Sequence, residues 1–152
     1  MKLSTKGRYA MIALTDLVRN GEGRLVSLTE ISERQDVSLP YLEQLFLKLR
    51  RADLVESVRG PGGGYRLSRL PADIRVSEIL AAVDEAMDAL TRGQGALGGA
   101  TDTTEQTLTN KLWEQLSANV YVFLHQTRLS DVIKDEMVPC QAVSQLVQWA
   151  DD

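Results

Sequence analysis

The sequence predicts a mainly α-helical fold with one small β-hairpin and a long final helix. Between residues 4 and 51, apolar residues recur every three or four positions in three successive segments, each opened by a serine. Residues 54–58 and 65–67 read as short strands on either side of a glycine-rich turn, which is typical of a hairpin. Residues 104–126 then keep a helical apolar period over a length of roughly 30 Å.

The composition is that of an ordinary soluble protein and favours no enzyme. The chain has 152 residues, of which 43% are hydrophobic and 25% charged. No apolar run approaches the ~18 residues of a membrane span, and the first ten residues do not read as a signal peptide, so we expect a cytoplasmic protein with no membrane contact. With one histidine and one cysteine, Cys140, the chain offers no internal disulfide and no catalytic constellation.

The first three helices predict a helix-turn-helix. Serines at positions 4, 27 and 38 are placed to cap them, and Ser27 with Glu30 forms a capping box. The second helix is short and is followed by a turn at residues 35–37. The third helix runs to about Arg51, with a polar outward face and an inward apolar stripe of Leu42, Leu45, Phe46 and Leu49. Two short helices joined in this way, the second with a polar outward face, are typical of DNA-binding helix-turn-helix units.

The stretch RGPGGGY at residues 59–65 is either a phosphate-binding loop or the tip of a hairpin. A nucleotide-binding glycine loop needs a helix directly behind it, whereas Tyr65-Arg66-Leu67 returns here as a strand. The hairpin therefore follows the helix-turn-helix directly and predicts the wing of a winged helix. Its glycines let the backbone approach DNA closely, and Arg59 at its base can enter a minor groove.

We expect four parts in the chain. Residues 1–70 form the winged helix-turn-helix domain, 71–103 a connecting helix and loop, 104–126 a dimerisation helix, and 127–152 a C-terminal segment. Ser77 is expected to cap the connecting helix, which would end near Met87. The long helix carries an apolar stripe that needs a partner, and a second copy of the chain supplies it. The expected dimer contacts are Leu108, Leu112, Leu116, Val120 and Phe123.

The charge is divided between the two halves of the chain. Residues 1–70 hold 12 Lys and Arg against 8 Asp and Glu, while residues 71–152 hold 5 against 13. This division indicates that the first half meets a polyanion and the second half does not. A twofold dimer with one reading helix in each subunit then predicts double-stranded DNA with a roughly palindromic operator as the partner.

Several stretches together resemble the family of iron–sulfur cluster assembly regulators. They are MKLSTKGRYA at 1–10, ISERQ at 31–35, SLPYLEQLFLKLR at 38–50 and VRGPGGGYRL at 58–67. The resemblance continues to about residue 133. It implies a dimeric winged-helix transcription factor, mostly a repressor, that controls genes of iron–sulfur cluster assembly and iron response.

The family's DNA-reading positions correspond to Ser38, Tyr41, Glu43, Gln44 and Arg59 in this sequence. Gln44 can pair with an adenine edge through two hydrogen bonds, and Glu43 can accept one from cytosine. The hydroxyls of Ser38 and Tyr41 can bond phosphates or bases. The predicted DNA-binding set also contains Pro40, Lys48, Gly60, Gly62, Gly63 and Gly64.

The sequence departs from the family at the cofactor. Members with an iron–sulfur cluster carry three cysteines in the loop before the long helix and a histidine at its start. Here residues 92–107 hold no cysteine, and Thr107 and Asn110 stand where the last cysteine and the histidine are expected. One hypothesis is a sensor that holds a cluster, [2Fe–2S] in type, through Cys140 and, as a weaker candidate, His125. The alternative is a cofactor-free repressor that responds to another signal.

Overall fold

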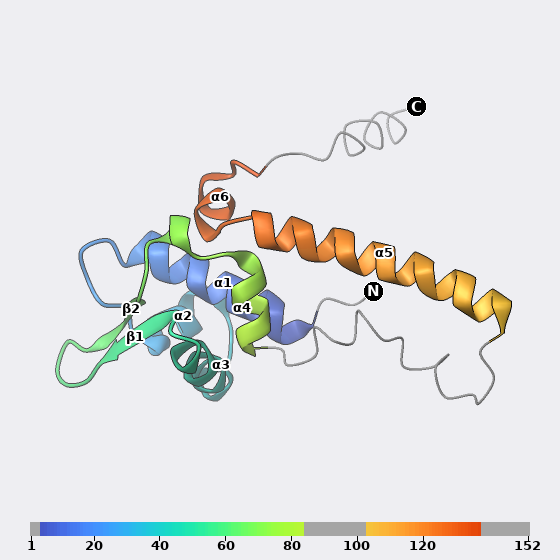
Figure 1. Cartoon of the computed structure of the whole chain (residues 1–152). Helices are drawn as coiled ribbons and strands as arrows, with labels where there is room; N and C mark the ends of the chain where they lie inside the picture. The colour runs from blue at the N-terminus through green and yellow to red at the C-terminus, as the bar shows by residue number, and fades with distance from the viewer. Residues whose placement is uncertain (1–3, 84–102, 138–152) are drawn as a thin grey trace, which may run out of the picture.

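The computed structural model describes residues 4–83 and 103–137, and it has the predicted class of fold: mostly helical, with a two-stranded wing (Figure 1). The elements in order are α1 (Thr5–Asn20), α2 (Leu28–Gln35), α3 (Leu39–Arg51), β1 (Val55–Val58), β2 (Gly64–Leu67), a 3-10 turn (Pro71–Asp73), α4 (Val76–Val83), α5 (Thr104–Gln126) and α6 (Leu129–Lys134).

The first three helices begin where the serines predicted. Ser4 accepts a hydrogen bond from the Gly7 N–H at 3.1 Å, and Ser38 accepts one from the Tyr41 N–H at 3.3 Å. Ser27 and Glu30 form the full capping box, each side chain accepting from the other residue's N–H. These caps are local in sequence, so the serines alone were enough to predict where the helices start.

The predicted start of α4 is wrong. The helix begins at Val76, so Ser77 lies inside it and caps nothing. Its hydroxyl is instead 3.2 Å from the Nδ1 atom of His125, far along the chain. Glu78 fills the role at the helix start by accepting a hydrogen bond from the Arg75 N–H. The expected end near Met87 lies outside the described residues.

The hydrophobic core lies where α1, α2, α3 and α4 meet. Leu14, Ile31, Leu42 and Phe46 are each 0% exposed. The wing joins this core because the Tyr65 ring packs edge-on against Phe46, with ring centroids 4.9 Å apart. The stripe predicted for α3 is therefore its buried face, which leaves the opposite face of the helix turned outward.

A buried carboxylate ties α1 to α2. Asp16 is 3% exposed and receives two hydrogen bonds from the Arg34 guanidinium, at 2.7 and 3.0 Å, and one from the Gln35 amide at 2.7 Å. Burial alone would raise the pKa of Asp16, but the hydrogen bonds from Arg34 and Gln35 outweigh it and lower the pKa. The carboxylate thus fixes the end of α2, one turn before α3 begins.

The long helix α5 has the predicted bounds and extends away from the rest of the molecule (Figure 1). Its C-terminal end is joined to the segment before α4 by two backbone hydrogen bonds, from Val76 N–H to the Thr127 oxygen and from Leu129 N–H to the Ile74 oxygen, both 2.9 Å. Leu129 is 0% exposed, so α6 packs into the core of the winged helix. No helix in the two described ranges is long and apolar enough to cross a membrane.

We expect the Asp16→Asn variant to lose about 1.5–3 kcal/mol of unfolding free energy, because an amide cannot replace the charged acceptor of these bonds. The pKa of Asp16 in the folded protein lies below its ordinary value of 3.8. The extra stability of the wild type is therefore present above that value and is lost as the pH falls through the lower, folded-state pKa. Urea unfolding of both proteins at pH 7 and at pH 3 measures this.

The matched control is Glu33→Gln on the exposed side of α2. It should leave the stability unchanged at pH 7. An equal stability of wild type and Asp16→Asn at pH 7 would contradict the role given to Asp16.

Candidate DNA interface

The outward face of α3 carries two hydrogen-bonding side chains, Glu43 and Gln44, that no other described residue engages. Pro40, Glu43 and Gln44 are exposed along this face, and Ser38 is exposed at its N-terminal end. Neither the Glu43 carboxylate nor the Gln44 amide makes a hydrogen bond or ion pair with any residue in the described ranges. Side chains of these two types can read the base edges in a major groove.

Two predicted contact residues lie at the edges of this face. Tyr41 is half-buried, with its ring edge-on to Tyr9 at a centroid distance of 5.5 Å. Burial raises the pKa of Tyr41, which keeps the hydroxyl protonated and able to donate a hydrogen bond. Lys48 is turned toward α4, where its ammonium lies 3.4 Å from the Val83 carbonyl oxygen.

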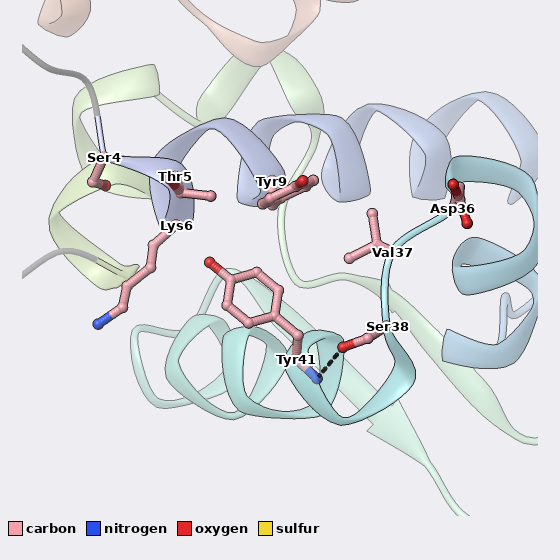
Figure 2. Close-up of a pocket in the computed structure, with 8 residues that line it drawn as sticks. All are labelled: Ser4, Thr5, Lys6, Tyr9, Asp36, Val37, Ser38 and Tyr41. Carbon is pink, nitrogen blue, oxygen red and sulfur yellow. Dashed lines mark hydrogen bonds between the residues drawn. The ribbon is translucent and has the colours of Figure 1, made fainter.

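A cleft of about 620 Å³ opens between the N-terminal ends of α1 and α3 (Figure 2). In Figure 2 the Tyr41 ring stands between the two helices, with its hydroxyl directed toward Thr5 and Lys6. The Lys6 side chain is exposed and forms no ion pair with the described part of the chain. The cleft thus brings a cation and several hydroxyls together at one end, while the Asp36 carboxylate lies at the other end, away from Lys6. Its lining residues are Ser4, Thr5, Lys6, Tyr9, Asp36, Val37, Ser38 and Tyr41.

Lys6 was not predicted as a site residue, although its place in the first turn of α1 could have indicated one. A cation in the first turn of a helix opposes the positive end of the helix dipole, so it stabilises the helix less than an acid would. Such a placement favours a role toward an anion outside the helix. The contribution of α3 to the same cleft could be found only from the structure.

The wing is an antiparallel hairpin in which Val55 pairs with Leu67 and Val58 with Gly64. On its exposed face, Arg66 and Glu56 form an ion pair with a 3.0 Å separation. Arg59 follows the first strand, is exposed, and makes no hydrogen bond or ion pair with another described residue. Its guanidinium is therefore available to an anion or a narrow groove.

The wing glycines meet two separate requirements. Gly60 and Gly62 adopt φ angles of +111° and +73°, which disfavour other residues, and an added Cβ there would meet open space. Gly63 and Gly64 are crowded instead. A Cβ on Gly64 would lie 2.6 Å from the Val26 carbonyl oxygen, where the hairpin bridges to the loop before α2. Gly63 and Gly64 are thus required because the chain's own backbone packs closely against them. Gly60 and Gly62 are required for their φ angles, and the space beside them at the tip is empty.

The weaker metal candidate, His125, takes part in the joint between α5 and α4. Its Nδ1 atom lies 3.2 Å from the Ser77 hydroxyl, its ring stacks on Tyr121, and its carbonyl oxygen accepts a hydrogen bond from Arg75 at 2.6 Å. Within residues 4–83 and 103–137, no three His, Cys, Asp or Glu side chains are grouped so that they could hold a metal ion. Cys140 lies outside these ranges.

A helix-turn-helix followed by a glycine-rich wing defines a winged-helix DNA-binding regulator. The family model of Rrf2, described as iron-dependent transcriptional regulators, matches residues 3–135. The chain therefore belongs to the Rrf2 family.

Curated relatives support this assignment. The chain is 64% identical, over 154 aligned positions, to the HTH-type transcriptional regulator IscR of Cereibacter sphaeroides, with 100% of this chain and 99% of the relative covered. It is 46% identical to an Escherichia coli IscR over 138 positions, which cover 91% of this chain and 83% of the relative. These relatives are transcriptional regulators and not enzymes, so the predicted class of function and the resemblance are both confirmed.

Solved structures agree with the fold. The chain matches T. potens IscR with a TM-score of 0.70 at 38% identity, covering 93% of each chain. It matches CymR, the global cysteine regulator of B. subtilis, with a TM-score of 0.70 at 30% identity, covering 88% of this chain and 97% of that one. One scaffold thus serves regulators with different named roles, so the signal that this chain senses depends on its own residues.

Proposed function

We propose that this chain is a cytoplasmic, homodimeric regulator, mostly a repressor, of genes for iron–sulfur cluster assembly and iron response. The observation that carries the DNA-binding part is the pair of side chains Glu43 and Gln44, exposed on α3 and without a partner in the described chain. The target genes are inferred from the extent of its similarity to the C. sphaeroides regulator.

In the proposed complex, α3 lies in the major groove and the wing reaches the neighbouring minor groove. Glu43 and Gln44 bond base edges, while Arg59 enters the minor groove. Ser38, Tyr41 and Lys6 hold a backbone phosphate in the cleft between α1 and α3, because an ammonium and hydroxyl donors suit an anion. Base contacts would give the sequence preference, and the phosphate contacts would set the register of α3 on the duplex.

The proposed dimer forms through α5. Leu108, Leu112, Leu116 and Phe123 are 60, 58, 40 and 52% exposed, although they are large apolar residues on one helix. Ser117, which is buried, lies on a different side of α5 and packs against the chain itself. Val120 is half-buried between the two sides. A second copy would cover the exposed leucines, and its twofold axis would match a roughly palindromic operator.

In the proposed dimer, the joint between α5 and the winged helix would determine the distance between the two α3 helices, and so the spacing of the operator half-sites. Two backbone hydrogen bonds and the Ser77–His125 contact fix the C-terminal end of α5 to the start of α4. Pairing of two α5 helices therefore places two α3 helices at a set distance. Binding to successive major grooves on one side of the duplex requires about 34–36 Å between half-sites.

Iron–sulfur sensing remains the first hypothesis for the signal, with Cys140 as a ligand. The described residues do not supply a set of donors for a cluster, and His125 is engaged with Ser77 and Tyr121. A cluster would thus depend on ligands outside the described residues. The absence of cysteine from residues 92–107 favours the second candidate, a repressor that binds no cofactor.

Gln44→Ala and Arg59→Ala should each weaken operator binding by about 1–3 kcal/mol, because each substitution removes one side-chain contact in a DNA groove. Fluorescence anisotropy on an operator selected from random DNA measures the affinity. Gln115→Ala on α5 and Arg19→Ala on α1 are matched controls on exposed positions. Wild-type affinity in both Gln44→Ala and Arg59→Ala would refute the assignment of the reading face.

Lys6→Ala should weaken binding to specific and unrelated DNA by the same factor. One lost phosphate contact also lowers the slope of log affinity against log salt by about 1. Titrations at several salt concentrations give this slope, and Lys111→Ala on α5 is the control. An unchanged slope in Lys6→Ala would show that no phosphate occupies the cleft.

Leu116→Asp should dissociate the dimer, because a carboxylate would be buried there without a partner. Ala118→Asp puts the same charge on another, exposed side of α5 and should leave the dimer intact. Analytical ultracentrifugation distinguishes the two. A Leu116→Asp protein that sediments as an unchanged dimer would refute this interface.

Cys140→Ala, purified without oxygen, should lose visible charge-transfer absorbance and bound iron while the dimer persists, because Cys140 is the only thiolate of the chain. Ser77→Ala, which removes the hydroxyl that contacts His125 and leaves Cys140 in place, serves as the control. A Cys140→Ala protein with the parent's full spectrum and iron content would exclude Cys140 as a ligand. Wild-type protein without either signal would favour the cofactor-free repressor.

A further inference from the structure

One leucine of α3 lies on the wrong side of the helix for the core. Leu47 is 44% exposed, whereas Leu42, Leu45 and Leu49 of the same helix are 0–2% exposed. Leu47 is also absent from the partly buried residues that pack against the core. The fold therefore gives no reason for a large apolar side chain at this position.

The position of Leu47 places it among the proposed base-reading residues. It follows Gln44 by three residues and Glu43 by four, and it precedes Arg51 by four. Residues at these spacings are neighbours on one face of a helix. All three neighbours are exposed and polar, so Leu47 is an isolated apolar group within a hydrogen-bonding surface.

The dimer interface does not account for this exposure. The exposed leucines of α5 form the apolar stripe proposed to meet a second copy. In Figure 1, α3 and α5 lie on opposite sides of α1 and α4, so Leu47 is not continuous with that stripe. The surface around Leu47 is instead continuous with the exposed polar face of α3 that is proposed to read DNA.

We propose that Leu47 contacts the 5-methyl group of a thymine in the major groove and makes the operator specific for thymine at that position. The inference rests on the proposed DNA-binding function and adds a specificity-determining residue to it. The 5-methyl is the apolar group that an unmodified base pair presents on its major-groove edge. Removing a group of that size from water changes an affinity by about fourfold.

The test uses the full chain and an operator that it selects from random DNA. Each thymine is replaced in turn by deoxyuridine, which lacks only the methyl group, and the affinity of wild type and Leu47→Ala is measured on every duplex. We expect one thymine of each half-site at which deoxyuridine weakens wild-type binding by about fourfold. At that position the Leu47→Ala protein should bind the thymine and deoxyuridine duplexes with equal affinity. At every other thymine it should show the same thymine-to-deoxyuridine affinity ratio as wild type.

Ile12→Ala is the matched control, since Ile12 is an aliphatic residue of α1 with 42% exposure. The Ile12→Ala protein should retain the wild-type thymine-to-deoxyuridine affinity ratio at every position.

Unchanged thermal unfolding of Leu47→Ala excludes a folding defect. The contact is overturned if Leu47→Ala keeps the wild-type thymine-to-deoxyuridine ratio at every position, or weakens binding equally on both bases. A chain that selects no DNA sequence overturns the proposed function and this contact together.

Discussion

The buried carboxylate of Asp16 is the constraint on which the proposed reading face of α3, with Glu43 and Gln44, depends. It joins α1 to the last turn of α2 through Arg34 and Gln35, and the turn into α3 begins at the next residue. A charge that is 3% exposed is stable only while its donors hold it. Because those donors come from the end of α2, their geometry sets how α3 leaves the turn, and with it where Glu43 and Gln44 point.

Two further sets of contacts fix the wing and α5 relative to α3. The Tyr65 ring on Phe46 joins the wing to the inner face of α3, so that Arg59 and the α3 side chains belong to one unit. At the other end, the backbone bonds around Val76 and Leu129 fix α5 to the same unit. The proposed reading face, the wing and the proposed dimer helix are thus connected through the core. In the proposed dimer, a change at the α5 joint would alter the spacing of the two α3 helices.

The sequence predicted most of the fold because its signals are local. Serine caps determine the starts of α1, α2 and α3, and the apolar period of residues 104–126 predicted the bounds of α5. The structure adds Thr103 as the cap of α5, which the sequence analysis did not select. Ser77 was assigned wrongly because its partner, His125, is distant in sequence. The cleft beside Lys6 and the exposure of Leu47 also depend on how helices pack, which periodicity does not contain. Residues 92–107 lack the cysteines that the family pattern places there, and the sequence of this segment does not indicate which other residues would bind a cluster.

In the proposed complex, two copies of this chain read DNA with α3 in the major groove and the wing in the minor groove. Hydroxyl-radical footprinting of a selected operator measures this most directly, since the cleavage reports minor-groove and backbone access at each nucleotide. We expect protection that is symmetric about the operator centre, with minor-groove protection that disappears in the Arg59→Ala protein. A single unsymmetric protected patch, or a wild-type pattern in Arg59→Ala, would contradict the proposed complex.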